Sequence, residues 1–240
     1  MFVISVKYND WNIWYEKILE DFAFRQSDDE ESAQLLNNIL TQKQYYNINE
    51  KDFPDKAIIF GAGPSIKRHI NIFKNNYDPE DYLIIASDGA NTALLEEDII
   101  ADIIVTDLDG NIEDLIKANH EKSILFLHAH GDNKKQIQTI TPHLTRIIPT
   151  TQSEPHGILE NYGGFTDGDR ALHIAVYKLK MKEIILAGMD FGKITTKYSR
   201  PNQEKDVQEA DEFKKKKLSY AERLTDALIK NNPHIKFVKL

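Results

Sequence analysis

Apolar residues show two different periodicities along this chain. From position 56 onward, short runs of consecutive apolar residues, rich in isoleucine, alternate with stretches in which apolar residues recur every three or four positions. Consecutive apolar residues are typical of strands covered on both faces, and the spacing of three and four is typical of amphipathic helices. The predicted strands lie at 57–60, 83–86, 103–105, 124–127, 147–148 and 184–187. The predicted helices lie between them at 66–73, 92–97, 112–118, 134–140 and 170–178.

Strands and helices that alternate at this spacing predict βαβ units, because two parallel strands need a crossover connection. We therefore expect an α/β fold in which 56–240 form a Rossmann-like, mostly parallel, twisted sheet with helices on both faces. Residues 193–206 are polar and lack a periodic pattern, so we expect a long loop there that closes over a ligand. A helix is predicted at about 207–230 and a last strand at 235–238, on the edge of the sheet. The loop and this helix, at about 193–230, form an insertion in the α/β domain.

Residues 1–55 show a different pattern and predict a small, mainly helical N-terminal section. A short strand is expected at 2–6. Ser27 precedes four acidic residues, which predicts a cap and the first turn of a second helix. The first helix is predicted from one broad apolar stripe, and its two tryptophans are expected to pack in the core rather than to bind a ligand. The stripe consists of Trp11, Trp14, Tyr15, Ile18, Leu19 and Phe22.

The composition mainly excludes classes of function. Hydrophobic residues make up 41% and charged residues 28% of the 240 residues, which is ordinary for a globular protein. The formal net charge of −8 opposes binding to nucleic acid and suits a partner that brings its own cation, such as a magnesium nucleotide. The absence of cysteine excludes disulfides, thiolate metal sites and cysteine nucleophiles. No apolar run reaches the roughly 18 residues of a membrane span, and the N-terminus lacks the order of a signal peptide, so we expect a cytoplasmic protein.

Two carboxylates, Asp107 and Asp109, follow the predicted strand at 103–105. Side chains alternate faces along an extended segment, so both carboxylates are expected to point the same way while Leu108 turns toward the core. At the carboxyl end of a central parallel strand they would lie where open α/β folds bind ligands. Two like charges so close repel unless a cation intervenes, and Mg²⁺ prefers such oxygen ligands. The alternative is an ordinary turn at a strand end, because Asp and Gly are favoured there.

The turn after the first core strand reads Gly61-Ala62-Gly63-Pro64-Ser65. Its glycines allow a tight turn and a close approach of the backbone, and Pro64 suits the first position of a helix. The N-terminus of that helix would offer unpaired amides and a partial positive charge to a phosphate. The turn is neither a full dinucleotide-binding fingerprint nor a Walker loop, and an ordinary strand-to-helix turn is the alternative.

Polar clusters also follow the other predicted strands. Because the strands are predicted to be parallel, these clusters are expected to meet at one edge of the sheet. In 87–91, Asp88 either contacts a ribose or a metal or caps the next helix. In 128–133, the alternating His, His and Asp are compatible with zinc or iron. The oxygen-rich setting favours instead a role toward phosphate or Mg²⁺ for His128 and Asp132.

A double glycine and the order Asp-Gly-Asp-Arg precede the predicted helix that follows the fifth strand. Asp167 or Asp169 would cap this helix, and Arg170 is suited to hold a phosphate through two hydrogen bonds. Asp190 follows the last core strand. The run of four lysines at 214–217 is expected to be a solvated helix face rather than a phosphate site.

In their order, these motifs resemble those of the archaeal 6-hydroxymethyl-7,8-dihydropterin pyrophosphokinases, distant relatives of the catalytic domain of thiamine pyrophosphokinase. The resemblance covers about 56–192. Thiamine pyrophosphokinase carries serine where this chain has Gly110, and its β-sandwich domain has no counterpart in the sequence, so thiamine is disfavoured as the substrate. The motifs are Gly61-Ala62-Gly63-Pro64-Ser65, Ser87-Asp88-Gly89-Ala90, Thr106-Asp107-Leu108-Asp109-Gly110, His128-Ala129-His130-Gly131-Asp132-Asn133, 163–170 and Gly188-Met189-Asp190-Phe191-Gly192.

The resemblance implies Mg²⁺-dependent transfer of a diphosphate from ATP to the hydroxymethyl group of a reduced pterin, with release of AMP, in folate or methanopterin biosynthesis. Asp107 and Asp109, with Asp88, would hold Mg²⁺, and Arg170 would stabilise the transferring group. The partners would be ATP and a reduced pterin, and homo-oligomer formation is left open. The residues implied for the nucleotide are Gly61, Gly63, Pro64, Ser65, Asp88, Gly89, His128, Asp132 and Asn133. The residues implied for the pterin are Gly164, Thr166, Asp167, Asp169 and Asp190.

Other functions stay open at this point. One is a thiamine pyrophosphokinase-like enzyme. Another is a glycosyltransferase-like protein that uses a nucleotide sugar, because similar Gly-Pro-Ser and Asp-x-Asp features occur in a related domain of flagellin-modifying proteins. The last is a non-catalytic module that binds a nucleotide.

Overall fold

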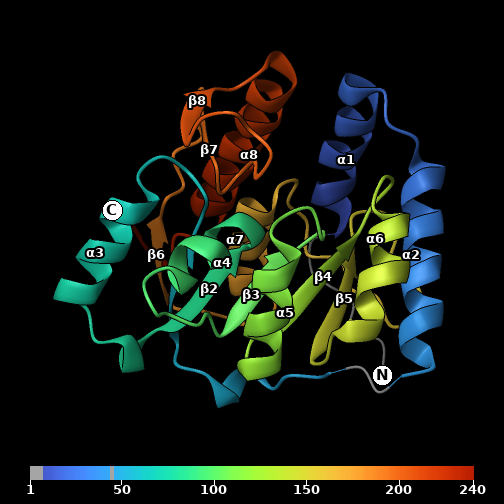
Figure 1. The fold of residues 1–240 in the computed structure, drawn as a ribbon. Coiled ribbons are helices and arrows are strands. Elements are labelled where there is room, and N and C mark those ends of the chain that lie inside the picture. Colours follow the sequence, from blue (N-terminus) through green and yellow to red (C-terminus); the bar gives the residue numbers. More distant parts are fainter. Residues whose placement is uncertain (1–7, 44–45) are drawn as a thin grey trace.

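A computed structural model describes residues 8–43 and 46–240, and the strand predicted at 2–6 lies outside them. Within the described residues, seven strands form one sheet in the order β5-β4-β3-β2-β1-β6-β9, and every neighbouring pair is parallel (Figure 1). This confirms the predicted parallel α/β fold and the edge strand near the C-terminus. The strands are β1 Lys56–Phe60, β2 Leu83–Ser87, β3 Ile103–Thr106, β4 Ile124–Ala129, β5 Ile147–Thr151, β6 Glu183–Ala187 and β9 Lys236–Lys239.

Helices cover both faces of the sheet, as predicted. One face carries α2 to α6, and the other carries α7 and α8. No helix of the described part of the chain is long and apolar enough to cross a membrane. The helices are α1 Tyr8–Phe22, α2 Gln26–Thr41, α3 Ile66–Asn76, α4 Asp88–Leu95, α5 Ile112–Glu121, α6 Lys134–Ile140, α7 Asp167–Tyr177 and α8 Glu212–Asn231.

The strands β1 to β6 are buried on both faces, which explains their uninterrupted apolar runs, whereas the edge strand β9 is not. In β1, Ile58 and Phe60 point into the core under α2 to α6, whereas Ala57 and Ile59 point into the core under α7 and α8. β1 pairs with β2 on one side and with β6 on the other, so the sheet changes its direction of growth at β1. Open parallel sheets bind their ligands at the carboxyl ends of the strands beside such a switch point.

The two predicted N-terminal helices are present. α2 begins at Gln26, and the residue at its N-cap is Arg25, so Ser27 lies inside the first turn and is not the cap. α2 packs beside α6 over β4 and β5 and places Leu36 in the main core. α1 packs on α8 through a separate aromatic cluster that includes Trp11 and Tyr220. The division of the chain at residue 55 stays a prediction.

The segment after β6 differs from the prediction. β7 Ile194–Thr196 pairs with β8 Val207–Glu209 in an antiparallel hairpin, so the predicted loop at 193–206 is confirmed at 197–206 and wrong at 194–196, which form a strand. The helix predicted from about 207 begins only with α8, after Asp211, whose carboxylate accepts a hydrogen bond from the backbone N–H of Lys214. The β-branched residues in these short segments favour strand pairing, and an Asp cap fixes where the helix starts.

The hairpin segment is docked on the first half of the sheet. The Thr196 hydroxyl donates a hydrogen bond of 2.7 Å to the carbonyl of Ala62. Tyr198 is buried, and its hydroxyl donates to the carboxylate of Glu96. These contacts hold the hairpin against the turn after β1 and the end of α4, and the role of a closing lid stays a prediction.

Candidate active site

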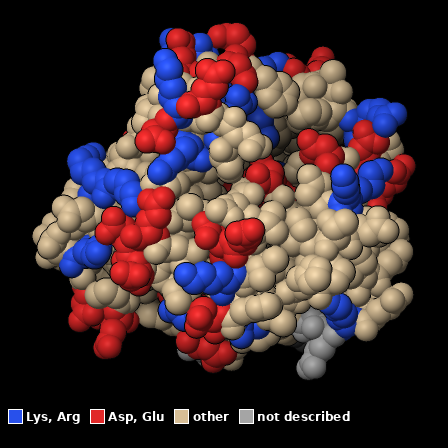
Figure 2. Space-filling model, in the orientation of Figure 1, with Lys and Arg blue, Asp and Glu red and all other residues tan. Residues whose placement is uncertain are grey.

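A cavity opens at the carboxyl ends of β1, β2, β3 and β6. Its volume is about 910 Å³, including the open mouth. The turns after these strands, the start of α7, the hairpin and the first turns of α8 form its walls. Figure 2 shows this hollow with acidic side chains on its floor and basic side chains on the side of α8. Its position at the carboxyl ends of parallel strands is where open α/β folds bind small-molecule ligands.

Four carboxylates meet at the floor of the cavity and form what we call the acidic cluster: Asp88, Asp107, Asp109 and Asp167. Each offers one oxygen, and these oxygens all lie within 4.8 Å of one another. The Oδ1 atoms of Asp88 and Asp107 are buried and have no hydrogen-bond partner among the described residues. Buried carboxylate oxygens without donors, in a set made only of oxygen ligands, fit Mg²⁺.

The turn after β3 brings two members of the cluster together. β3 ends at Thr106, and Leu108 takes a left-handed conformation with φ of 68° while its side chain is buried. The prediction that Leu108 points to the core is confirmed, but the predicted reason, alternation along an extended strand, is wrong. The Thr106 hydroxyl donates to Asp88 and accepts from the N–H of Leu108 at 2.9 Å. One hydroxyl therefore connects the start of α4 with the turn that carries Asp107 and Asp109.

Burial and, after it, the neighbouring charges raise the pKa of three carboxylates of the cluster. Burial raises the pKa of Asp88 to about 7, and the charges of Asp109 and Asp107 add to this against the hydrogen bond from Thr106. Asp109 is exposed at the cavity, but partial enclosure by the cavity walls and the charge of Asp107 raise its pKa to about 7 as well. Burial, followed by the charge of Asp107, raises the pKa of Asp167 well above its ordinary value. A cation between these groups would offset both effects.

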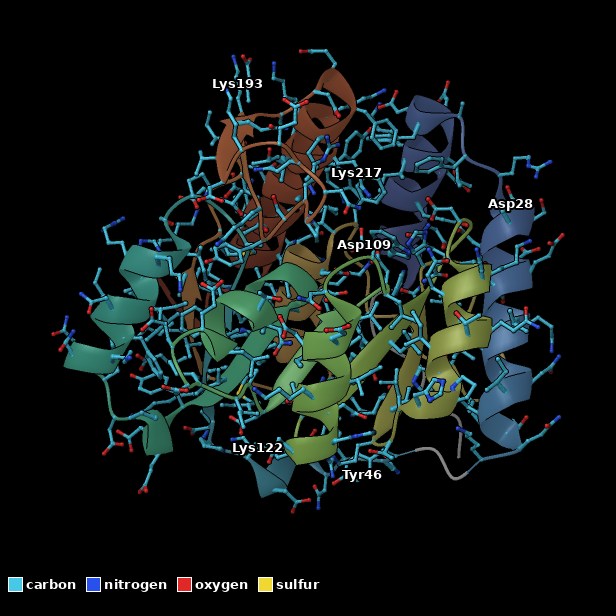
Figure 3. All side chains as sticks on the ribbon, in the orientation of Figure 1. Asp28, Tyr46, Asp109, Lys122, Lys193 and Lys217 are labelled. Carbon is cyan, nitrogen blue, oxygen red and sulfur yellow. The ribbon has the colours of Figure 1, made fainter. Side chains whose placement is uncertain are left out.

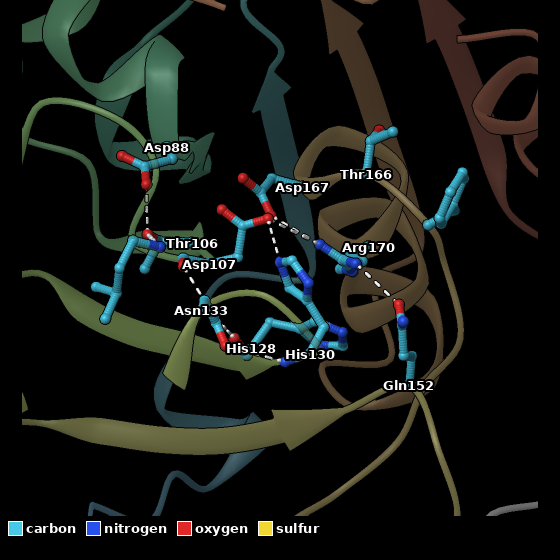
Figure 4. Close-up of polar contacts among 12 residues, drawn as sticks. Asp88, Thr106, Asp107, His128, His130, Asn133, Gln152, Thr166, Asp167 and Arg170 are labelled. Atoms are coloured by element: carbon cyan, nitrogen blue, oxygen red, sulfur yellow. Dashed lines mark hydrogen bonds and ion pairs between the residues drawn. The ribbon is translucent and has the colours of Figure 1, made fainter. Parts of the chain in front are cut away.

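Two basic side chains neutralise Asp107 from the other side (Figure 4). His130 Nε2 lies 3.0 Å from Asp107 Oδ2, and its Nδ1 lies 2.8 Å from Asp132 Oδ1. Arg170 Nη1 lies 3.7 Å from Asp107 Oδ2 and 3.1 Å from Asp167 Oδ1. Burial opposes ionisation of Asp107, but the hydrogen bond from His130 and the charge of Arg170 hold its pKa well below the usual range. Burial also opposes the charge on His130, yet its two carboxylate partners raise its pKa to about 9.

His128 is buried beside His130 and does not line the cavity. Its Nδ1 lies 3.0 Å from the Thr150 hydroxyl, and burial lowers its pKa well below the ordinary value. Both ring nitrogens of His130 are occupied by carboxylates, and among the described residues the acidic cluster is the one group suited to a metal. The segment 128–133 therefore supports no zinc or iron centre of its own. Asn133 donates to the carbonyls of Asp107 and His128 and so ties two turns together.

The amides of the turn after β1 are already used inside the protein. The N–H groups of Gly61 and Gly63 donate to the carbonyls of Ala187 and Gly188, at 2.8 and 2.9 Å. The N–H and the hydroxyl of Ser65 both donate to Asp190 Oδ2, at 3.1 and 2.9 Å. The helix N-terminus that was expected to receive a phosphate thus holds an internal carboxylate.

Close packing explains the glycines on both sides of this contact. A Cβ on Gly61 would lie 2.7 Å from the carbonyl oxygen of Gly188, and a Cβ on Gly188 would lie 2.2 Å from that of Gly61. Gly188 also has φ of 64°, a conformation that favours glycine. The turns after β1 and β6 can approach this closely only without side chains.

Asp169 is a helix cap. Its oxygens accept hydrogen bonds of 2.7 Å from the N–H groups of Phe165 and Thr166, and it completes a capping box with Thr166. Asp88 does not cap a helix at position 92, because α4 begins at Asp88 itself. Of the two roles considered for each of these aspartates, the structure shows the cap for Asp169 and membership of the acidic cluster for Asp88.

The predicted site residues divide into those that line the cavity and those that do not. Those that line the cavity are Gly61, Gly63, Pro64, Gly89, Asp107, Asp109, Thr166, Asp167 and Asp190. Those that do not line it are Ser65, Asp88, His128, Asp132, Asn133, Gly164, Asp169 and Arg170. In the second group, Asp88 is itself a member of the acidic cluster, and Arg170 forms ion pairs with Asp107 and Asp167.

Sequence reasoning missed several residues of the site. His130 contacts Asp107, and Gln152 accepts a hydrogen bond from Arg170 at 3.2 Å. Lys214 and Lys217 line the cavity, so the prediction of a solvated face at 214–217 is wrong for these two. The three-residue spacing of these lysines was the available signal, because it puts both on one face of a helix.

The chain was compared with known proteins. It matches the family model described as "6-hydroxymethylpterin diphosphokinase MptE-like" over residues 31–196. It is 48% identical over 222 residues to the 6-hydroxymethyl-7,8-dihydropterin pyrophosphokinase of Methanothermobacter thermautotrophicus, which covers 92% of this chain and 94% of that relative. The chain belongs to this family. The relative of the same description from Methanocaldococcus jannaschii is 47% identical over 242 residues, which cover 96% of this chain and 98% of that relative. The relative from Pyrococcus furiosus is 38% identical over 237 residues, which cover 98% of this chain and 99% of that relative.

Membership of the MptE-like family confirms the resemblance inferred from the motifs. The family match includes the acidic cluster and the turn after β1 and ends before α8. Among solved structures, a Maf glycosyltransferase from Magnetospirillum magneticum AMB-1 is similar, with a TM-score of 0.51 and 16% identity. The similarity covers 89% of this chain and 38% of that chain, and at this identity it shows a shared fold alone.

Proposed function

We propose that this MptE-like protein transfers a diphosphate from ATP to the hydroxymethyl group of 6-hydroxymethyl-7,8-dihydropterin and releases AMP. The observation that carries the proposal is the acidic cluster on the floor of an open cavity, in a chain whose relatives are named as pyrophosphokinases of this pterin. Thiamine and nucleotide sugars are not favoured, because no named relative acts on them and the similarity to the glycosyltransferase concerns the fold.

The reaction forms one bond and breaks one. The hydroxymethyl oxygen of the pterin attacks the β-phosphorus of ATP, the bond between this phosphorus and the α,β-bridging oxygen breaks, and AMP leaves. The hydroxyl proton is lost to a base or to water. Such transfers need alignment of the reactants and stabilisation of phosphate charge more than covalent help from the protein.

The acidic cluster supplies the oxygen ligands that Mg²⁺ requires, with Asp107 and Asp109 nearest the cavity and Asp88 behind them. Mg²⁺, when bound, would neutralise phosphate charge and orient the triphosphate. Arg170 lies between Asp167 and Gln152, and this fixes the direction of its guanidinium toward the cluster. Its role would be to keep a positive charge behind Asp107 and Asp167, the carboxylates that line the cavity.

The two substrates would occupy different walls of the cavity. The nucleotide would lie along Gly61, Gly63, Pro64 and Gly89, in contact with the surface of the turn rather than with its internally bonded amides. The remaining wall offers acceptors for the amino-pyrimidine edge of the pterin. These are the side chains of Thr166, Asp167 and Asp190.

The proposal is tested by removing the ligands for the cation. Asp107→Ala and Asp109→Ala should each reduce turnover by about 1,000-fold or more, because each removes a metal ligand at the reacting phosphates, while the fold is kept. The measurement is Mg²⁺-dependent release of AMP in the presence of the reduced pterin, with circular dichroism to check folding. Glu113→Ala, which removes an exposed carboxylate in the first turn of α5, is the control and should retain wild-type turnover. Near wild-type rates in both aspartate variants would contradict the proposal.

A further inference from the structure

Two lysines of α8 face the acidic cluster across the cavity. Lys214 and Lys217 line the same cavity as Asp107 and Asp109, and Figure 3 shows Lys217 on the side of α8, above Asp109. They are three residues apart, which places them on one face of the helix. Both are half-buried.

Neither lysine has an acidic partner. In the part of the chain that the structure describes, no ion pair involves Lys214 or Lys217. The ammonium group of Lys217 lies 5.3 Å from the ring centroid of Phe165, another residue of the cavity wall. Burial and the charge of Lys217 lower the pKa of Lys214, while the charge of Asp109 acts on it across the cavity in the opposite direction.

Lys215 and Lys216, which lie between them in the sequence, both have acidic partners. Lys215 pairs with Glu209 and Glu212, at 2.7 and 2.9 Å, and Lys216 lies 4.0 Å from Asp21. Neither lines the cavity. The four-lysine run therefore has two members that are satisfied by neighbouring carboxylates and two that remain available to a ligand.

The ligand that fits is an anion that also carries a divalent cation. Carboxylates alone on the cavity floor would repel a phosphate chain, and the amides of Gly61, Gly63 and Ser65 are already bonded to internal acceptors. A magnesium diphosphate can place its metal on the acidic cluster and its outer oxygens on ammonium groups. The cavity presents these two kinds of group on facing walls.

We infer that Lys214 and Lys217 form a subsite for the diphosphate portion of ATP, the β- and γ-phosphates that are transferred. This inference rests on the proposed function and adds to it an element outside the segment that matches the family model. The subsite recognises the diphosphate by its charge and leaves the α-phosphate and the adenosine to the other walls.

The test compares two double variants in the full chain. Lys214→Gln with Lys217→Gln removes the subsite, and Lys215→Gln with Lys216→Gln removes the same number of charges from the same helix turns. Binding is measured by calorimetry with Mg²⁺ and α,β-methylene-ATP, whose α,β link cannot be cleaved, and separately with AMP. The first pair should weaken binding of the ATP analogue about 30- to 100-fold, since charge-assisted hydrogen bonds are lost, and change binding of AMP less than about threefold.

The control pair should bind the ATP analogue within about threefold of the wild type, because only long-range charge is changed. Lys214→Arg with Lys217→Arg should recover most of the lost affinity. The inference is overturned if the wild type does not bind the analogue, if both glutamine pairs lose equal affinity, or if binding of AMP falls as much as binding of the analogue. A wild type that binds the analogue through these lysines but does not modify the pterin would support the subsite and contradict the proposed function.

Discussion

At the scale of single residues, Thr106 controls the geometry of the acidic cluster through one hydroxyl. It donates to Asp88 and accepts from the N–H of Leu108, which holds the left-handed residue between Asp107 and Asp109. A buried side chain that satisfies both a donor and an acceptor is costly to replace: the N–H of Leu108 would be left unpaired, and Asp88 Oδ2 would keep only the hydrogen bond of 3.3 Å from the N–H of Gly110.

Thr106→Val keeps the shape of the side chain and removes the hydroxyl. We expect the free energy of unfolding to fall by about 1–3 kcal/mol, because the N–H of Leu108 loses its partner, and turnover to fall at least about tenfold, because Asp88 is released. Thr106→Ser keeps the hydroxyl, and its turnover should stay near wild type. Urea denaturation and AMP release measure the two effects. Equal turnover in the valine and serine variants would rule out this role for the hydroxyl.

At the scale of elements, the N-terminal helices support the site from outside the sheet. Asp29 of α2 is buried, and its oxygens accept from the Tyr15 hydroxyl at 2.6 Å, the Gln152 amide at 3.0 Å and the N–H of Gly131 at 2.7 Å. Gln152 in turn accepts from Arg170. A single carboxylate thus connects α1 and α2 with the segment of His130 and with the guanidinium beside the acidic cluster.

Asp29→Ala removes the centre of this network. It should lower the free energy of unfolding by about 3 kcal/mol, because several buried donors lose their acceptor, and it should also reduce turnover, because Arg170 loses its support. Asp28→Ala is the matched control: Asp28, the neighbour of Asp29 in α2, is half-buried and pairs with the exposed Arg25, and its loss should cost less than about 1 kcal/mol. Denaturation by urea, followed by circular dichroism, separates the two variants. Equal stability of the two variants would contradict the role of Asp29.

At the scale of the whole molecule, the acidic cluster leads us to expect that stability depends on a divalent cation. The protein carries a net charge of −8, and four of its carboxylates are held within a few ångströms of one another at the sheet edge. A cation that binds there and not to the unfolded chain stabilises the fold by mass action, by about 2.7 kcal/mol at 100 times its dissociation constant.

Mg²⁺ at saturating concentration should therefore raise the Tm by about 5 °C or more, and chelation with EDTA should reverse the rise. The variant with Asp107→Asn and Asp109→Asn should show no such rise, because its ligands are weakened. Sodium chloride at equal ionic strength is the control for general screening and should have little effect. Differential scanning calorimetry provides the measurement, and an equal rise in wild type and variant would show that Mg²⁺ acts elsewhere.

Much of the fold was predictable because helix and strand periods are local properties. The apolar runs at 57–60 and 103–105 are typical of strands covered on both faces, and parallel strands place their carboxyl ends at one edge. That reasoning correctly brought Asp107 and Asp109 to a common site with the turn after β1. It could not place the hairpin of β7 and β8, because a polar segment with little periodicity forms strands only where tertiary contacts dock it.

Local patterns along the chain were enough to predict the strands of the main sheet, most of its helices, the polar residues that follow the strands and the resemblance to a pterin pyrophosphokinase. How each polar group is used became clear from the folded chain: His130 and not His128 meets Asp107, the amide of Ser65 is taken by Asp190, and Lys217 lines the cavity. The physical reason is that a backbone period depends on neighbours along the chain. The partner of a hydrogen bond or a charge depends on residues that are distant in sequence and meet only when the chain is folded.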